Sequence, residues 1–526
     1  MSGQCVPYTE PPRTTFTLTV AVGGSGTGTV TSTPAGLACA TGTCTFKFDA
    51  GTQVSLGAAP SSGMFLGWSE GCSGAGGCAV TMDRDRTIAA LFGTPGEALW
   101  SFQLGGGQND GALAVAVDSR SDVYAAGRFQ GSFMVGTTPL NSMGSADVFV
   151  AKLSGVDGSP IWIKTFGSPG FDTAVAIAVD SSDNLYLAGS FSGAIDFGGG
   201  TRTPIGSPDL FVVKLDPQGQ HVWSNSFGGP NIDAASGISV GSGTVAVSGS
   251  FSSSMTISGQ TLTSTGTGGY VALFSTAGVF ARVKAFTGSG TCIPRGVAID
   301  GAGNVVVGGI FNGTIDLGNG AATATSYDVF VSKLSATGSY LFGRTFGGSS
   351  NDAGGEVSTD AMDNILITGT FSGSVNFGGA SPVNTNVSNL AVIKYSPAGS
   401  YRWAQAFGGT TSQLTATRSS SNPAGDVVVT GYFCGSVAFG SVTMSSVQAC
   451  PVDVDMFAVK LAAADGTAVT GTRAGGSSSD ASYGVAQASN GHYFMAGNFT
   501  GFADFGGQAR TSAGGEDAVI VALAPL

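Results

Sequence analysis

The sequence predicts an all-β protein, in which a seven-bladed β-propeller of four-stranded blades follows a small all-β module. The tripeptide Gly-x-Phe recurs seven times between Gly127 and Phe499, and successive phenylalanines lie 60 to 66 residues apart. One supersecondary unit is therefore repeated. Each period contains four alternating, strand-like segments separated by turn residues, as in a propeller blade. Glycine makes up 86 of the 526 residues, which is typical of turn-rich β-structure.

The chain divides into three predicted parts. Residues 1–15 are rich in proline and predict a flexible, extended tether. Residues 16–93 begin with the alternating segment Phe16-Thr-Leu-Thr-Val-Ala-Val and continue through short strand-like pieces, so they predict a separate small all-β module. Residues 97–526 contain the repeats and predict the propeller.

Several phrases of the small module carry a family resemblance. They are Val30-Thr-Ser-Thr-Pro-Ala-Gly, the pair Cys39 and Cys44, Phe65-Leu-Gly-Trp-Ser-Glu-Gly-Cys, Cys78-Ala-Val-Thr-Met, and the Ala-Leu-Phe that ends at Phe92. In these phrases the module resembles the divergent InlB B-repeat family of bacterial surface proteins. The resemblance implies an extracellular spacer or adhesive unit, and we expect Trp68 to pack in its core.

The second repeat shows the four segments of one period, which we name D, A, B and C in chain order. They are Ile161-Trp-Ile-Lys-Thr-Phe-Gly, Ala174-Val-Ala-Ile-Ala-Val-Asp, Leu185-Tyr-Leu-Ala-Gly-Ser-Phe and Asp209-Leu-Phe-Val-Val-Lys-Leu. A family resemblance is carried by Val179-Asp-Ser-Ser-Asp-Asn-Leu-Tyr-Leu-Ala-Gly-Ser-Phe-Ser-Gly, Asp196-Phe-Gly-Gly, Asp209-Leu-Phe-Val-Val-Lys-Leu and Trp223…Phe227-Gly-Gly. In these phrases the chain from Glu97 to Leu526 is similar to the SBBP family, the bacterial seven-bladed β-propeller repeat. The resemblance implies the propeller fold and transfers no catalytic residue.

The order of segments predicts how the propeller closes. The chain enters the repeats on a D segment, Glu97–Leu104, and ends on a C segment, Asp517–Leu523. The last copy therefore has no D segment of its own. We expect the first D strand to pair with the last C strand, which removes an exposed sheet edge and places Trp100 in the last blade.

The repeated Gly-x-Phe residues are expected to be structural. Glycine in segment B admits the close approach of a neighbouring backbone, and the phenylalanine buries a large apolar face between blades. The turns between segments A and B, such as Asp180–Asn184 and Asp300–Asn304, are expected to be stabilised by Asx hydrogen bonds rather than by bound calcium.

The spacing of the eight cysteines predicts three local disulfides, Cys39–Cys44, Cys72–Cys78 and Cys434–Cys450. Local disulfides indicate an oxidising compartment. A zinc site is the alternative, but it needs tighter and more numerous cysteine pairs. We therefore expect an extracellular or cell-surface protein of bacterial type.

Cys5 and Cys292 have no predicted disulfide partner. Cys5 precedes a proline-rich stretch, where a bacterial lipoprotein carries its acylated cysteine, so a lipid anchor at Cys5 is one interpretation. An ordinary thiol in the tail is the other, because Gln4 is unusual before a lipidation cysteine and no apolar signal core precedes it.

The composition disfavours several classes of partner. The formal net charge is −12, which disfavours a nucleic-acid backbone as partner. No apolar run reaches the roughly 18 residues that a membrane span needs. His221 and His492 are the only histidines, too few for a His-rich metal site. We expect no nucleic-acid partner, no membrane span and no cofactor, with calcium as an alternative.

Acidic residues recur at the start of segments A and C. Six residues after the last apolar residue of each D segment the chain carries Asp110, Asp172, Asp233, Cys292, Asp352, Gln413 and Asp480. Segment C begins with Asp147, Asp209, Asp328, Asn389, Asp455 and Asp517. If segment A is innermost, both series lie on the face that also carries the long B–C loops.

Two interpretations of these acids stay open. In the structural one, each aspartate accepts backbone N–H groups and fixes the junction between blades. In the functional one, Asp110, Asp172, Asp233, Asp352 and Asp480 form an acidic binding funnel for cations or for a positively charged or polyhydroxylated ligand. Cys292 and Gln413 would make such a funnel asymmetric.

We expect a non-enzymatic binding or scaffold protein, whose ligand is an extracellular protein or glycan engaged by the long-loop face. One alternative is a glycan hydrolase or lyase that uses paired carboxylates at the channel mouth. Against an enzyme, the chain has no sialidase-type Asp-box, no Ser-His-Asp set and no nucleophile elbow. The other alternative is a calcium-stabilised structural protein of an extracellular matrix.

Overall fold

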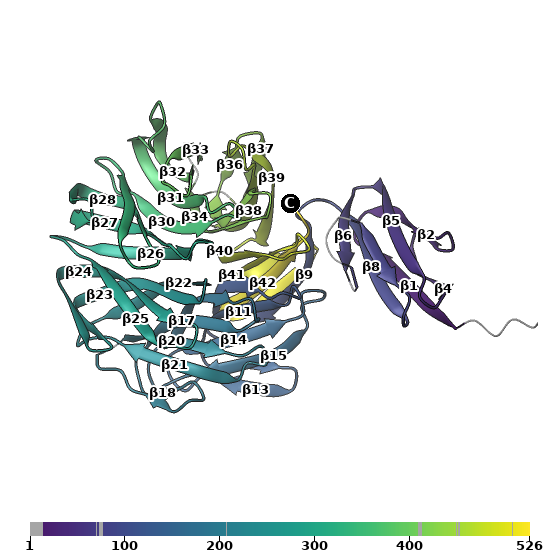
Figure 1. The fold of residues 1–526 in the computed structure, drawn as a ribbon, viewed down its shortest axis with the longest axis horizontal. Helices are drawn as coiled ribbons and strands as arrows, with labels where there is room; N and C mark the ends of the chain where they lie inside the picture. Colours follow the sequence, from purple (N-terminus) through teal and green to yellow (C-terminus); the bar gives the residue numbers. More distant parts are fainter. Residues whose placement is uncertain are drawn as a thin grey trace, which may run out of the picture. The chain divides into compact units, whose positions relative to one another are not determined.

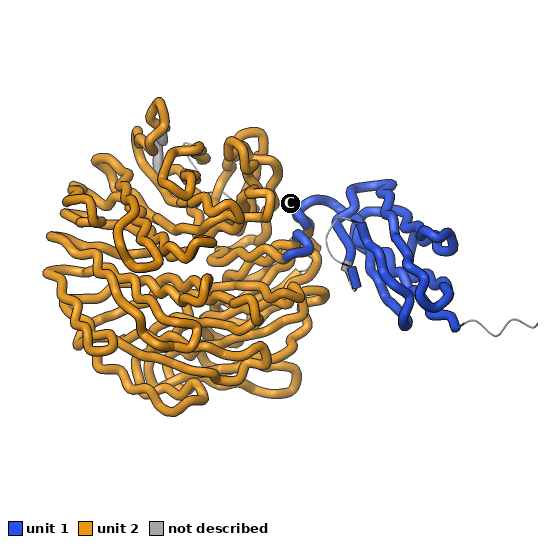
Figure 2. Tube along the Cα trace, viewed as in Figure 1, with its two compact units in different colours: residues 1–97, 489–491, 525 blue, residues 98–488, 492–524, 526 orange. Residues whose placement is uncertain are grey.

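The computed structural model describes residues 14–69, 71–72, 77–206, 208–408, 413–448, 450, 453–507 and 509–526. Most of the predicted tether, and with it Cys5, lies outside the described residues. The chain forms two compact units (Figure 2). The first contains residues 1–97, 489–491 and 525, and the second contains residues 98–488, 492–524 and 526.

The first unit contains two four-stranded sheets around one core. One sheet has the order β4 (Gly42–Asp49), β1 (Thr15–Gly23), β8 (Arg86–Gly93), β6 (Met64–Ser69), and the other has the order β3 (Ala38–Cys39), β2 (Thr27–Thr33), β5 (Gln53–Ser62), β7 (Cys78–Thr81). Leu18, Val30, Trp68 and Phe92 belong to a shared apolar cluster, and Trp68 is 2% exposed. The predicted core position of Trp68 is confirmed.

The second unit is built from antiparallel sheets that follow one another in chain order (Figure 1). Five of them have four strands: β10 (Gly111–Val117), β11 (Val123–Phe129), β14 (Asp147–Leu153), β15 (Pro160–Phe166); β16 (Thr173–Val179), β17 (Leu185–Phe191), β20 (Asp209–Leu215), β21 (His221–Phe227); β22 (Asp233–Gly241), β23 (Thr244–Ile257), β24 (Gln260–Ser275), β25 (Phe280–Phe286); β26 (Cys292–Ile299), β27 (Val305–Asp316), β28 (Ala321–Leu334), β29 (Tyr340–Phe346); β30 (Ala353–Thr359), β31 (Ile365–Val375), β32 (Val383–Tyr395), β33 (Tyr401–Phe407).

The remaining strands form one eight-stranded sheet and small hairpins. The large sheet contains β34 (Gln413–Ser421), β35 (Val427–Cys434), β38 (Asp455–Leu461), β39 (Ala468–Gly476), β40 (Asp480–Gln487), β41 (Tyr493–Asp504), β42 (Ala509–Leu523) and β9 (Ala98–Leu104). Two-stranded hairpins in the B–C loops are β12 (Ser132–Val135) with β13 (Thr138–Asn141), β18 (Ile195–Asp196) with β19 (Thr201–Arg202), and β36 (Ser436–Phe439) with β37 (Val442–Ser445).

The first strands of successive four-stranded groups form a ring. We call β10, β16, β22, β26, β30, β34 and β40 the inner strands. Each contacts the next in this order, and β40 contacts β10. In the eight-stranded sheet, β39 pairs with β41 only through Gly475 and Gly476, so this sheet consists of two four-stranded halves. The second unit is thus an all-β, propeller-like ring.

The predicted closure of the ring is confirmed. β9 pairs antiparallel with β42, and Trp100 lies opposite Ala522. The Trp100 ring packs on Phe494 with the ring centroids 5.7 Å apart. Its Nε1–H donates to the carbonyl oxygen of Gly155 at 3.2 Å, which follows β14 of the first four-stranded sheet. The chain segment at the start of the ring therefore completes the sheet at its end.

The repeated Gly-x-Phe residues are structural, as predicted. The phenylalanines are fully buried: Phe129, Phe191, Phe251, Phe311, Phe371, Phe433 and Phe499. A Cβ atom added at Gly127 would lie 1.9 Å from the carbonyl oxygen of Gly111 on the adjacent inner strand. Only glycine admits this approach.

The three predicted disulfides are confirmed, at Cys39–Cys44, Cys72–Cys78 and Cys434–Cys450. Cys292 is a free, buried thiol, and burial raises the pKa of this thiol far above its usual value. Within the described ranges, no helix is long and apolar enough to cross a membrane.

Candidate functional site

A β-bulge interrupts each inner strand at an equivalent point. The register between each inner strand and the second strand of its sheet shifts at one point. In most copies this point lies two or three residues after the inner strand begins. One additional residue is inserted there in each strand: Leu113, Val175, Ser236, Arg295, Gly355, Thr417 and Tyr483. A bulge bends its strand and redirects a side chain. The chemistry of the inserted residue differs from copy to copy.

The inserted residues surround a cavity of about 530 Å³, which we call the channel mouth. Inserted residues that line it are Leu113, Val175, Ser236, Arg295, Thr417 and Tyr483. They lie near the start of the inner strands, and the B–C loops emerge at the same end because neighbouring strands run antiparallel. The channel mouth therefore lies on the long-loop face, where the sequence predicts ligand binding.

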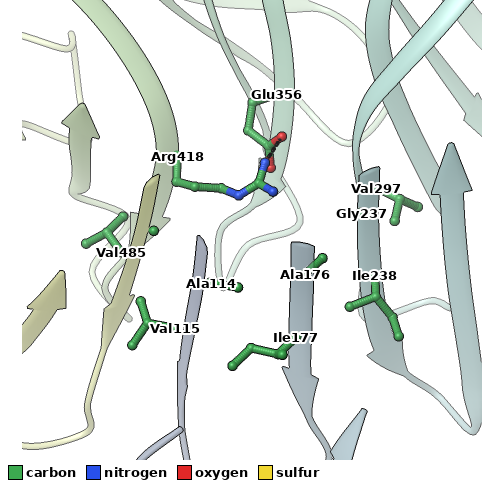
Figure 3. Close-up of a pocket in the computed structure, with 11 residues that line it drawn as sticks. Ala114, Val115, Ala176, Ile177, Gly237, Ile238, Val297, Glu356, Arg418 and Val485 are labelled. Carbon is green, nitrogen blue, oxygen red and sulfur yellow. Dashed lines mark ion pairs between the residues drawn. The ribbon is translucent and has the colours of Figure 1, made fainter. Parts of the chain in front are cut away.

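Glu356 and Arg418 form an ion pair that borders both the channel mouth and a second pocket of the channel (Figure 3). Both residues directly follow the bulge. The equivalent residues of the other inner strands are small: Ala114, Ala176, Gly237, Gly296 and Gly484. A Cβ atom added at Gly296 would lie 2.6 Å from Glu356 Oε2, so the small residues leave space for the two charged side chains.

The ion pair reaches across the channel. Arg418, on β34, donates from Nη2 to the carbonyl oxygen of Ser236 on β22 at 3.5 Å. Side-chain exposure is 25% for Arg418 and 14% for Glu356. Burial raises the pKa of Glu356 to about 7, against the opposing effects of Arg418 and then Arg295. Burial and the two guanidinium groups thus act on the pKa of this carboxyl in opposite directions.

The predicted funnel aspartates lie at the start of the inner strands but are buried. Asp110, Asp172, Asp233, Asp352 and Asp480 are each at most 1% exposed. Each accepts a backbone N–H group, from a residue four positions earlier or twenty positions later. The donors are Gly106 and Gln130, Ser168 and Ser192, Gly229, Ser372, and Gly476 and Thr500, respectively. These contacts support the structural interpretation, and the binding funnel stays a prediction.

Each of these aspartates faces an aspartate of the preceding four-stranded group. The pairs are Asp110 with Asp517, Asp172 with Asp147, Asp233 with Asp209, Asp352 with Asp328, and Asp480 with Asp455. Burial is the first cause that raises their pKa values, which reach about 6 for Asp110, Asp233, Asp328 and Asp352 and about 8 for Asp480. The neighbouring acid raises the pKa values of Asp110, Asp233, Asp328 and Asp480 further.

Contacts around Gly105 show how close the two acids of a pair lie. A Cβ atom added at Gly105 would lie 2.5 Å from Asp517 Oδ1 and 2.9 Å from Asp110 Oδ2. Asp517 Oδ1 is buried and accepts no hydrogen bond from the described residues. A proton shared between the two carboxyls would satisfy this oxygen and remove one of the two like charges.

Two junctions lack the acid pair, and both acids are missing in each. Gly268 and Cys292 replace the pair at one junction, and Asn389 and Gln413 replace it at the other. At the other junctions a glycine follows the D strand. At the junction that contains Gly268, this position is occupied by Thr287. Gly268, Thr287 and Cys292 therefore differ from the other junctions as a set, because a carboxylate and a threonine do not fit in the same space.

The sequence reasoning did not identify Glu356, Arg418 and Arg295 as site residues. It followed the acids that recur, whereas Glu356 and Arg418 occupy a position that is small in the other copies, and Arg295 occupies the inserted position, which differs from copy to copy. Aligning the inner strands on the residues that precede the bulge would have exposed charged side chains at such positions. Their proximity across the ring could be seen only in the structure.

We predict that a Gly167→Thr substitution destabilises the protein by roughly 1–3 kcal/mol, as overpacking of a core does. The added Cβ would lie 1.8 Å from Asp147 Oδ2. Adding Asp147→Gly recreates the combination found at Gly268 and Thr287, and should recover part of the loss. Urea denaturation measures the coupling between the two changes.

Gly107→Thr is the matched control, because a Cβ at Gly107 meets no atom within 4 Å. It should leave the urea midpoint nearly unchanged. Additive effects of Gly167→Thr and Asp147→Gly would contradict the proposed fit between the glycine and the acid.

We also predict that the protein becomes less stable as the pH rises from 5 to 8. The folded-state pKa of Asp480 is about 8 against an ordinary value of 3.8. Between these values the folded state binds more protons than the unfolded state, so its stability falls with rising pH. Melting temperatures at pH 5 and pH 8 measure the difference.

Asp480→Asn removes this titration and should narrow the difference by about 2–4 °C. Asp465→Asn removes the same charge from an exposed turn and serves as the control. An equal pH dependence in wild type and Asp480→Asn would show that Asp480 does not titrate in this range.

No family model matches the chain. A WD repeat-containing protein of Acanthamoeba polyphaga mimivirus, described as uncharacterized, is 27% identical over 115 residues, which cover 20% of this chain and 8% of that protein. The chain thus matches less than a tenth of that relative's length.

Solved structures similar to this chain include Kuenenia stuttgartiensis hydrazine synthase, with 12% identity, a TM-score of 0.40, and coverage of 74% of this chain and 93% of the other. BamB from Moraxella catarrhalis has 13% identity, a TM-score of 0.32, and coverage of 81% and 99%. Likeness at this level identifies no activity or partner.

Proposed function

We propose that the protein is a non-enzymatic binding or scaffold protein, located outside the cell or on a bacterial cell surface, which engages its ligand at the channel mouth. In this proposal the ring is a seven-bladed β-propeller of the SBBP type. The first unit is a spacer or adhesive module of the InlB B-repeat type. The ligand is an extracellular glycan or protein.

The blade count rests on the strand pairing. Each inner strand begins a group of four paired strands, and the eight-stranded sheet divides into two such groups at Gly475 and Gly476. The group that begins with β40 takes β9 as its outer strand. A closed ring of seven groups leaves no group without a partner on either side.

The observation that carries the proposal is the position of the bulges. The frame of the ring repeats, from the buried phenylalanines to most of the acid pairs. The inserted residues do not repeat, and they range from Leu113 to Arg295 and Tyr483 while facing one cavity. Constant structure around a variable, concave lining is the arrangement expected of a binding site on a repeat scaffold.

The three disulfides support an extracellular location, because disulfides persist in oxidising compartments. The lining of the mouth supports a binding role over hydrolysis. Among the residues that line it, Glu356 is the carboxylate, and Arg418 engages it. A glycosidase needs two carboxylates flanking the scissile bond.

We predict that ligand binding is lost when the aromatic side of the channel mouth is removed. The probe is an array of bacterial and host glycans, with a panel of secreted proteins, and the variant is Tyr432→Ala with Tyr483→Ala. Both tyrosines line the mouth. Truncating stacked aromatic groups should weaken binding about tenfold or more, because such contacts are worth roughly 1–3 kcal/mol.

Tyr340→Ala is the control, since Tyr340 lies on the outer strand β29. Retained binding by the double variant, at unchanged melting temperature, would place the ligand elsewhere. Release of cleaved glycan products by the wild type would favour the enzymatic alternative.

Calcium is the last alternative to test. Nine of the ten paired aspartates, all except Asp328, accept at least one backbone N–H group of the described residues, and the lone pairs used there are not available to a cation. We therefore predict that EDTA leaves the melting temperature unchanged within about 1 °C, because removing a ligand that stabilises the native state would lower it. A clear fall with EDTA that added calcium reverses would establish the calcium-stabilised alternative.

A further inference from the structure

Arg295 is a charged group of the channel mouth with unused hydrogen-bonding capacity. It is the inserted residue of the β26 bulge, it lines the mouth, and it is exposed. Glu356 and Arg418 act on it through charge. Its guanidinium makes no hydrogen bond with any residue in the described ranges, so its five N–H donors are free for a ligand.

The mouth carries an excess of positive charge in an acidic protein. Its charged lining residues are Arg295, Arg418 and Glu356. Glu356 pairs with Arg418, which leaves the charge of Arg295 uncompensated. The protein as a whole has a formal net charge of −12. A local charge opposite to that of the surrounding surface selects an anionic ligand and rejects a cationic one.

The other lining groups suit a hydroxylated ligand. Two residues with hydroxyl side chains, Thr370 and Thr415, and two aromatic residues, Tyr432 and Tyr483, line the mouth. The cavity of about 530 Å³ lies within the range of small-molecule sites. These features fit one or two sugar residues better than a flat protein surface.

We propose that the channel mouth binds a uronic acid residue of an acidic polysaccharide, with the sugar carboxylate held by the Arg295 guanidinium. This inference rests on the proposed binding function and names its ligand class. The tyrosines stack on the sugar ring, and the threonine hydroxyl groups bond to its hydroxyls. Arg418 is a positioning residue, fixed by Glu356 and by the carbonyl oxygen of Ser236.

A carboxylate matches the site better than a phosphate does. One planar guanidinium binds one carboxylate through two parallel hydrogen bonds. A phosphate dianion needs more donors than Arg295 supplies, and phosphate sites in proteins gather several backbone N–H groups for this purpose. The single uncompensated positive charge at the mouth matches a single negative charge per sugar residue.

The test uses the full chain and calorimetric titration with trisaccharides of galacturonic, glucuronic and mannuronic acid. The methyl ester of each trisaccharide is the matched ligand control, because it removes the charge at nearly constant size. We expect at least one of the acids to bind and its ester to bind about tenfold more weakly or not at all.

Arg295→Gln should weaken binding of the acid about tenfold or more, and Arg295→Lys should lose part of the affinity because it cannot form the bidentate contact. Arg120→Gln is the matched protein control. Arg120 is exposed in the turn after β10, at the opposite end of the inner strand, and its loss should leave the affinity unchanged.

Equal binding of acid and ester, an unchanged affinity in Arg295→Gln, binding of sulfated trisaccharides alone, or no binding of any acid would each overturn the inference. The proposed function fails separately. If another ligand binds and the Tyr432→Ala, Tyr483→Ala variant loses it, the channel mouth is a binding site for a different chemistry.

Discussion

The architecture of the ring depends on the pairing of β9 with β42. Each inner strand has a neighbour on both sides only if the chain returns to its own starting point, and this pairing makes it do so. Trp100 holds the closure from both sides, since it packs on Phe494 and donates to Gly155. The channel mouth depends on the same closure, because all seven inner strands contribute residues that line it.

Each copy contains structural residues that repeat and an inserted bulge residue that varies. Buried phenylalanines, glycines and most of the acid pairs repeat because they hold one sheet against the next, and every junction of the same shape needs the same contacts. The inserted residues of the bulges differ from copy to copy, and all except Gly355 line one cavity that the copies share. Two of them also bond to the next inner strand: Ser236 Oγ donates to the carbonyl oxygen of Pro294 at 2.7 Å, and Thr417 Oγ1 donates to that of Ser482 at 2.8 Å. A β-bulge thus takes one residue of each inner strand out of the regular ladder and redirects its side chain to where a ligand can meet it.

Much of the fold could be predicted from local patterns. Alternation and turn residues identified the strands, and the count of D and C segments identified Trp100 as part of the closing sheet. Short cysteine spacings identified the disulfides. The site was harder to predict. Whether Asp110 points to solvent or accepts N–H groups from Gly106 and Gln130 depends on loop geometry. The proximity of Arg295 to Glu356 and Arg418 depends on the packing of inner strands from three different repeats.

The concerted change of the junction residues bears on how such a ring can be rearranged. Each junction with an acid pair contains two acids and the glycine beside them. The glycine and one acid belong to one sheet, and the other acid belongs to the next sheet. A chimera cut between sheets would combine a carboxylate with a partner that has no matching group or no space for it. A cut inside a sheet would carry each junction across intact. A chimera of this protein therefore has to keep each interface between neighbouring sheets intact. Substitutions that make the copies differ have to preserve the match across the same interfaces.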